Sequence, residues 1–297
     1  MMFTKPTHCP NAACRYHSVT AERFFIKKGY FKTKWNRQPV PRYRCKGCGK
    51  FFSSHTFRDT FRQKKPFLNE QFFKLYAGGM TIRRIAIVLG CAKKTAERKF
   101  CFTARKARSI HEAKIAAGEI KTNYVLIDEQ ETFEHTKFRP LSIMMAVRAK
   151  DGFIIDAQVA SFKTRGTHHA PRKYVDEYRP DQRPVAIEDV LLTVKKCTRN
   201  EADLTIESDE GSSYSQILGR ILPQATYNRV RQLLPSYIPR AEQRKMRQPL
   251  FWMKVTQAKI RNDLSRMARK TWVTTKRDWG LQAHLDLYIA WNNRYKI

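Results

Sequence analysis

Two closely spaced cysteine pairs near the start of the chain constrain its folding more than any other feature. Cys9 and Cys14 have four residues between them, and Cys45 and Cys48 have two. Two such pairs separated by a loop match a zinc ribbon, in which each pair lies on a turn and four thiolates surround one ion tetrahedrally. We therefore predict a structural Zn²⁺ ion held by these four side chains, with four unrelated reduced thiols as the alternative.

The segment that carries the cysteine pairs is short and basic, so it has little material for a core of its own. Metal binding would therefore supply much of its folding free energy. Residues 44–50, RCKGCGK, place glycines where the backbone must curl around sulfur. His8 and His17 are alternative ligands, but the four thiolates already complete a tetrahedral site. We expect residues 1–62 to form a zinc-ribbon domain.

The charge of the chain predicts a polyanionic partner. Among 297 residues, 58 are Lys or Arg and 26 are Asp or Glu, which gives a net charge of +32. Hydrophobic residues make up 42% of the sequence, so this charge belongs to folded domains and not to a disordered tail. Phosphate backbones attract such a surface at long range.

The sequence contains no apolar run of about 18 residues, so we expect no membrane-spanning helix. Its first residues lack the apolar segment of a secretion signal. Seven cysteines are an odd number and too few for a disulfide scaffold of this size. We therefore expect a protein of the reducing cytoplasm.

A helical region follows the zinc ribbon and predicts a helix-turn-helix domain over residues 63–120. Gly78 and Gly79 break a first helix, Thr81 is a candidate N-cap for a helix over 82–89, and a basic helix begins near Ala92. In this arrangement the second helix of the pair enters the major groove of DNA. The pattern alone is unspecific, because any three short helices would give a similar sequence signal. The neighbouring zinc ribbon and the positive charge strengthen the interpretation as a helix-turn-helix. The candidate DNA-binding residues are Lys93, Lys94, Thr95, Arg98 and Lys99.

The remaining residues, 121–297, predict a mixed α/β domain. Strand-like runs begin at Tyr124, Leu141 and Phe153, and later strands alternate with helices. This order indicates a mixed sheet with helices on its faces.

Two aspartates stand at the ends of predicted strands in this domain. Asp128 ends an apolar run, and Asp209 follows the strand that begins near Leu204. If those strands are neighbours, the two carboxylates could converge on one divalent cation, and oxygen-rich sites suit Mg²⁺ or Mn²⁺. Two simpler roles remain open: Asp209 could cap the next helix, and Asp128 could pair with an arginine. We interpret Trp272, Trp279, Tyr288 and Trp291 as core residues and not as a base-stacking platform.

Several segments together resemble bacterial insertion-sequence DDE transposases with an N-terminal zinc ribbon and helix-turn-helix. They are RYRCKGCGKFF at 42–52, GMTIRRIA at 79–86, IDEQETF at 127–133, ESDEGSSY at 207–214, IRNDLSR at 260–266 and LDLYIAWNN at 285–293. The resemblance spans nearly the whole chain, and the order of the motifs is more specific than any one of them.

The resemblance implies a ribonuclease-H-like catalytic domain over residues 121–297. It also implies Mg²⁺- or Mn²⁺-dependent DNA strand cleavage and strand transfer, with recognition of terminal inverted repeats. Asp128 and Asp209 match the first two catalytic acids of this group. The expected partner is double-stranded DNA, both element ends and target site, bound by a homo-oligomer in the bacterial cytoplasm at the nucleoid.

The third acid of the family does not carry over directly. A glutamate usually stands shortly after a Thr-Lys pair and two residues before a Leu, and Trp279 occupies that position here. Asp278, one residue earlier, is the candidate replacement, although one residue turns a helix by about 100°. The first alternative function is therefore a catalytically impaired repressor or domesticated derivative that binds DNA. The second is an RNA-binding or RNA-cleaving protein.

Overall fold

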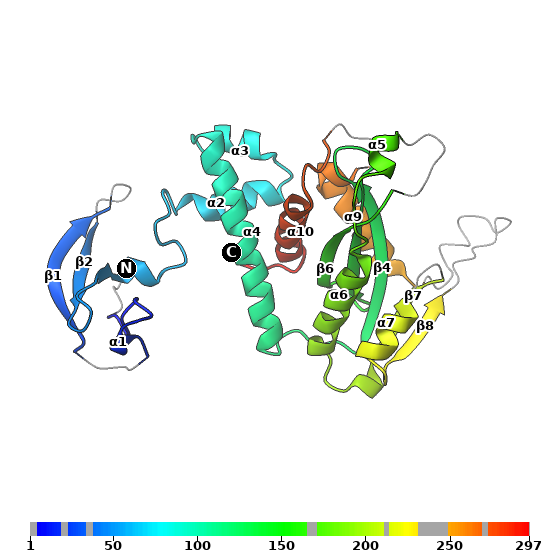
Figure 1. Ribbon diagram of the computed structural model, residues 1–297, viewed down its shortest axis with the longest axis horizontal. Helices are drawn as coiled ribbons and strands as arrows, with labels where there is room; N and C mark the ends of the chain where they lie inside the picture. The colour runs from blue at the N-terminus through cyan, green and yellow to red at the C-terminus, as the bar shows by residue number, and fades with distance from the viewer. Residues whose placement is uncertain are drawn as a thin grey trace. The chain divides into compact units, whose positions relative to one another are not determined.

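The computed structural model divides the chain into two compact units, residues 1–69 and 70–297 (Figure 1). The residues that the structure describes are 5–18, 23–33, 38–164, 171–210, 214–230, 249–268 and 273–296.

The first unit is a small antiparallel sheet with strand order β1-β2-β3. Its elements are α1 (Arg15–Ser18), β1 (Phe25–Lys32), β2 (Pro39–Cys45), β3 (Phe51–Ser53) and the 3-10 turn η1 (Ser54–Phe57). Strand β1 has no fully buried residue. The hydrophobic cluster consists of Phe24, Tyr43, Phe52 and three of the cysteines, so it is built from aromatic rings and thiols.

The second unit contains a five-stranded mixed sheet with strand order β6-β5-β4-β7-β8. Strands β4, β5 and β6 are antiparallel neighbours, whereas β7 runs parallel to both β4 and β8. The strands are β4 (Tyr124–Phe133), β5 (Pro140–Arg148), β6 (Ile154–Ser161), β7 (Thr205–Asp209) and β8 (Thr226–Val230). This confirms the predicted mixed α/β class.

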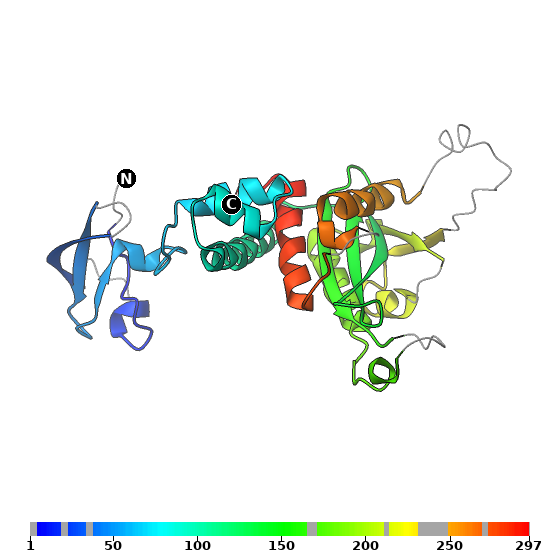
Figure 2. The same ribbon diagram turned by 90° about the horizontal axis from the view of Figure 1, so that it is seen from above.

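Helices cover both faces of this sheet (Figure 2). Helices α9 (Phe251–Asp263) and α10 (Asp278–Asn292) bury their apolar residues against one face, and α6 (Arg183–Cys197) and α7 (Tyr214–Ile221) against the other. The shorter elements are α5 (Arg172–Val175), η2 (Glu201–Asp203) and η3 (Ser265–Met267). None of the described helices combines the length and apolar character needed to cross a membrane.

Three helices before the sheet match the expected helix-turn-helix pattern: α2 (Leu68–Ala77), α3 (Ile82–Val88) and α4 (Lys93–Ala116). Gly79 follows α2 with φ +82°, a conformation that glycine adopts without strain. The hydroxyl of Thr81 accepts a hydrogen bond from the Arg84 backbone N–H, so Thr81 is the N-cap of α3, as predicted.

These helices are not a separate compact domain, which differs from the expected three-domain division. Phe72, Ile85 and Phe100 belong to the same hydrophobic cluster as Leu285 of α10 and Ile143 of β5. Helix α10 lies between α4 and the sheet (Figure 2), so one core joins the helical region to the sheet.

A buried ion pair fixes α4 at the edge strand β6. Arg108 of α4 donates to Asp156 of β6 at 2.7 Å, and the Asp156 side chain is fully buried. Thr193 of α6 donates to the other carboxylate oxygen at 2.9 Å. Arg108 is 26% exposed and also donates to Glu112 at 2.8 Å, so removal of Asp156 would leave it only this more exposed partner at hydrogen-bond distance.

We expect Asp156→Asn to lower the free energy of unfolding by about 1.5–3 kcal/mol, because Arg108 loses its charged hydrogen bond to a fully buried carboxylate. Urea denaturation of the full chain measures this. The matched control is Asp151→Asn, whose partner Arg148 lies at 2.6 Å in a more exposed setting, and which should cost at most about 1 kcal/mol. Equal losses in the two variants would contradict the assignment.

Candidate functional site

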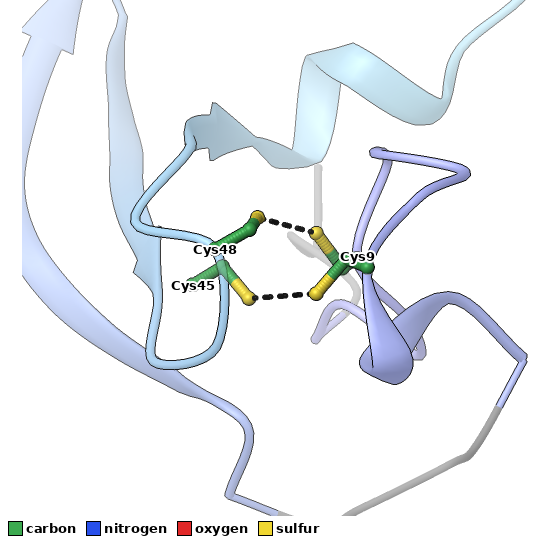
Figure 3. A group of neighbouring side chains, drawn as sticks. Cys9, Cys45 and Cys48 are labelled. Carbon is green, nitrogen blue, oxygen red and sulfur yellow. Dashed lines mark hydrogen bonds between the residues drawn. The ribbon is translucent and has the colours of Figure 1, made fainter.

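The four predicted cysteine ligands come together in the first unit. Cys9 and Cys48 have their sulfur atoms 3.6 Å apart, and those of Cys14 and Cys45 are 3.7 Å apart. All four sulfurs lie within 4.8 Å of one another. Figure 3 shows Cys45 and Cys48 on one turn, facing Cys9.

The sulfur spacing fits a tetrahedral metal site. With Zn–S bonds of about 2.3 Å, sulfurs at the corners of a tetrahedron are about 3.8 Å apart. The backbone N–H of Lys50 donates to Cys48 and lowers its pKa to about 6, whereas burial raises the pKa of Cys9 to about 12. The cluster can therefore hold a metal ion such as zinc, whereas His17 binds the Cys9 carbonyl oxygen instead.

Gly47 is required by the close packing of this site. A Cβ atom at position 47 would lie 2.9 Å from the Tyr16 ring and 3.3 Å from the Cys14 sulfur. Only a residue without a side chain lets the turn approach the opposite cysteine pair this closely.

The two predicted aspartates lie on neighbouring parallel strands. Leu126 of β4 pairs with Glu207 of β7, so continuing this register by two residues places Asp128 beside Asp209. Burial raises the pKa of Asp209, and the negative charge of Asp128 raises it further. The expected proximity of these two carboxylates is therefore present.

Helix α9 supplies two partners of Asp128 that the sequence reasoning missed. Gln257 donates to Asp128 Oδ2 at 2.9 Å, and Lys254 donates to the same oxygen at 3.2 Å. The Asp128 Oδ1 atom accepts from the backbone N–H of Glu129 at 2.8 Å. A sequence signal existed for Gln257, because it stands at a helical spacing between the buried residues Met253 and Ile260.

Two further polar side chains are buried near this pair. Gln130 follows Asp128 by two residues on β4, and Glu207 precedes Asp209 by two on β7, so strand alternation places each on the same face as its aspartate. Both amide atoms of Gln130 and the Oε2 atom of Glu207 have no hydrogen-bond partner among the described residues. A hydrated cation would satisfy the two oxygen atoms, Gln130 Oε1 and Glu207 Oε2, but not the Gln130 Nε2 donor.

The structure does not place Asp278 with the other two acids. Asp278 is exposed at the start of α10, where it accepts from the Trp279 backbone N–H at 2.6 Å. Among the residues described, the four cysteines are the one group of three or more potential metal ligands close enough to share an ion. The structure therefore does not bring Asp278 together with Asp128 and Asp209 into a three-acid cluster.

The two simpler roles for the aspartates also receive answers. Helix α7 begins at Tyr214, five residues after Asp209, so Asp209 is not at the N-cap position. Among the residues that the structure describes, Asp128 forms its ion pair with Lys254 of α9.

The five candidate DNA-binding residues of α4 differ in solvent exposure, because they lie on different faces of the helix. Lys93, Lys94 and Arg98 are exposed and Thr95 is partly buried. Both lysines form ion pairs with Glu97, at 3.4 and 3.5 Å.

Lys99 requires a correction, because it is buried on the core side of α4. Its position, three residues after Ala96 and four before Thr103, places it on the buried face. Burial lowers its pKa to about 8. The lysine therefore does not belong to the exposed set expected to meet DNA.

The aromatic series of the C-terminal region is also only partly core. Tyr288 is buried as expected, but Trp279 and Trp291 are about half exposed, at 55% and 51%. Trp272 lies outside the described residues.

No protein-family model matches the chain, and a search of curated protein sequences finds no match.

We expect removal of the metal by a chelator, or the substitution Cys45→Ser, to unfold residues 1–69 while the second unit stays folded. The reason is that three of the six residues in the hydrophobic cluster of the first unit are cysteines, so loss of the metal would disrupt that cluster. Amide hydrogen exchange on the full chain measures both units at once. Cys101→Ser is the matched control, because Cys101 lies in α4 outside the cluster. Unchanged protection of β2 after chelation would contradict a metal-dependent fold.

Proposed function

We propose that the protein is a DNA transposase of the zinc-ribbon, helix-turn-helix and DDE type. In this proposal, residues 1–69 and helices α2 to α4 hold double-stranded DNA. The acids Asp128 and Asp209 support metal-dependent strand cleavage and strand transfer. The observation that carries the proposal is the parallel pairing of β4 with β7, which places these two carboxylates side by side.

The architecture and the charge support this proposal. A mixed sheet with helices on both faces is what the resemblance to these transposases leads us to expect, in a ribonuclease-H-like domain. The excess of 58 basic over 26 acidic residues suits a phosphate backbone as the substrate surface. Assembly as a homo-oligomer on DNA belongs to the same proposal.

The donor set fits a magnesium or manganese ion. Such ions bind proteins through one or two carboxylates and leave positions for water and substrate phosphates. Asp128 and Asp209 would hold the ion, which would polarise the phosphodiester and activate the attacking hydroxyl. Gln257 and the Glu129 N–H keep the Asp128 carboxylate in place.

One observation favours a second candidate function, a DNA-binding repressor or domesticated transposase derivative. Lys254 already neutralises Asp128, and Asp278 stands apart from the acid pair. A chain with this arrangement could retain DNA binding without cleavage.

We expect the wild-type protein with Mg²⁺ to nick or join plasmid DNA that carries both flanks of its own gene. Asp128→Asn should abolish this activity and leave DNA binding intact, because the amide removes a metal ligand without changing the size of the side chain. Gel analysis of cleavage and fluorescence anisotropy of binding measure the two properties. The control is Asp203→Asn, an acid of the exposed turn η2. Full activity of Asp128→Asn would exclude the transposase assignment, whereas binding without cleavage by every form would favour the repressor.

We also expect Lys254→Met to tighten Mn²⁺ binding at the acid pair by roughly fivefold. The lysine competes for Asp128 Oδ2. Its own side chain is 45% exposed, so solvent screens the ion pair, which contributes about 1 kcal/mol. Electron paramagnetic resonance titration of Mn²⁺ measures the affinity.

Lys259→Met on the exposed side of the same helix is the control, and it should leave the affinity unchanged. Weaker Mn²⁺ binding by Lys254→Met would show that the lysine supports the site instead of competing for it.

A further inference from the structure

A pocket of about 200 Å³ lies beside the turn between α2 and α3. Its walls come from the second unit: the end of α2, residues 79–82 at the start of α3, residues 263–266 at and after the end of α9, Val273, and His284 of α10. The polar residues that line it are Tyr76, Thr81, Asp263, Ser265, Arg266 and His284. None of them belongs to the cysteine cluster or to the acid pair.

Arg266 brings a positive charge into this pocket without a counter-charge. Its side chain is partly buried, and no ion pair or hydrogen bond of its guanidinium occurs among the described residues. Burial lowers the pKa of Arg266, so the protein environment opposes the charge. A desolvated cation is costly unless an anion compensates it.

The neighbouring groups do not neutralise Arg266. Burial and the charge of Arg266 hold the pKa of His284 well below its usual range, so this histidine is neutral. Its Nδ1 atom is hydrogen-bonded to the Tyr76 hydroxyl. The carboxylate of Asp263 accepts from Asn262 at 2.8 Å and interacts with Tyr288.

The remaining polar groups of the pocket suit an anion with several oxygen atoms. The Thr81 hydroxyl accepts from the Arg84 N–H, which leaves its own proton available to donate. The Ser265 hydroxyl lies next to Arg266 in sequence and lines the same space. A planar guanidinium binds phosphate through two parallel hydrogen bonds.

We propose that this pocket binds one phosphate group of the DNA backbone, with Arg266 as its principal ligand and Thr81 and Ser265 as hydroxyl donors. The inference rests on the proposed DNA-binding function. A phosphate fixed beside the α2–α3 turn would set the position of the helix-turn-helix on the duplex, because backbone contacts fix register and orientation.

The test compares the salt dependence of duplex DNA binding between wild type and Arg266→Met. One phosphate contact contributes about 0.9 to the slope of log affinity against log salt. We expect the variant to lose about that much slope and roughly fivefold in affinity near 0.15 M salt. Arg220→Met, which removes the same charge from an exposed pair with Glu188, should leave the slope unchanged.

Two further measurements separate binding from folding. Arg266→Met should melt at the same temperature as wild type or higher, because methionine fills the space without a charge to desolvate. Arg266→Lys should keep most of the slope, since it keeps the charge, but should bind more weakly because it lacks the planar fork. If Arg266→Met does not fold, the lysine variant alone decides: affinity equal to wild type would overturn the proposal.

A titration with inorganic phosphate, followed by thermal shift, distinguishes the source of the phosphate. Stabilisation of wild type but not of Arg266→Met, together with the reduced slope, supports the backbone assignment. Stabilisation with an unchanged slope means that the pocket binds free phosphate and not the DNA backbone. If phosphate gives no stabilisation and the slope is also unchanged, the pocket is not an anion site and the proposal is overturned. If wild type does not bind DNA, the proposed function fails, and the phosphate titration still decides whether the pocket is an anion site.

Discussion

The parallel pairing of β4 with β7 is the constraint on which the candidate catalytic site depends. Asp128 and Asp209 are 81 positions apart in the sequence, and only the strand register brings them together. Two adjacent carboxylates repel each other, so the arrangement requires compensation. In the structure Lys254 and Gln257 of α9 provide it, and in the proposed active form a divalent cation would take over part of that role.

Local sequence signals predicted the parts of the fold that local physics determines. The cysteine spacing predicted a cluster whose sulfur distances fit a tetrahedral site. The apolar periodicity and the turn residues predicted α3 with Thr81 as its N-cap, and the alternation of strands and helices predicted a mixed sheet. Each of these features depends on residues close together in the sequence, or on the known preference of a tetrahedral metal ion for four cysteine ligands.

Features that arise from tertiary packing could not be predicted in this way. Lys99 belongs to a basic run, and only its helix face shows that it is buried. The Lys254 contact with Asp128 joins residues more than a hundred positions apart. Arg108 and Asp156 are 48 positions apart, and their pairing helps to join α4 to the sheet within one compact unit. Asp278 was chosen by resemblance, and the position of α10 separates it from the acid pair.

The central claim is that Asp128 and Asp209 together bind a divalent cation. Anomalous X-ray diffraction at the manganese edge, from crystals of the full chain grown with Mn²⁺, tests it most directly. We expect an anomalous peak about 2.2 Å from a carboxylate oxygen of each aspartate, with Lys254 displaced from Asp128. A crystal saturated with Mn²⁺ that shows no peak between these two carboxylates would contradict the claim.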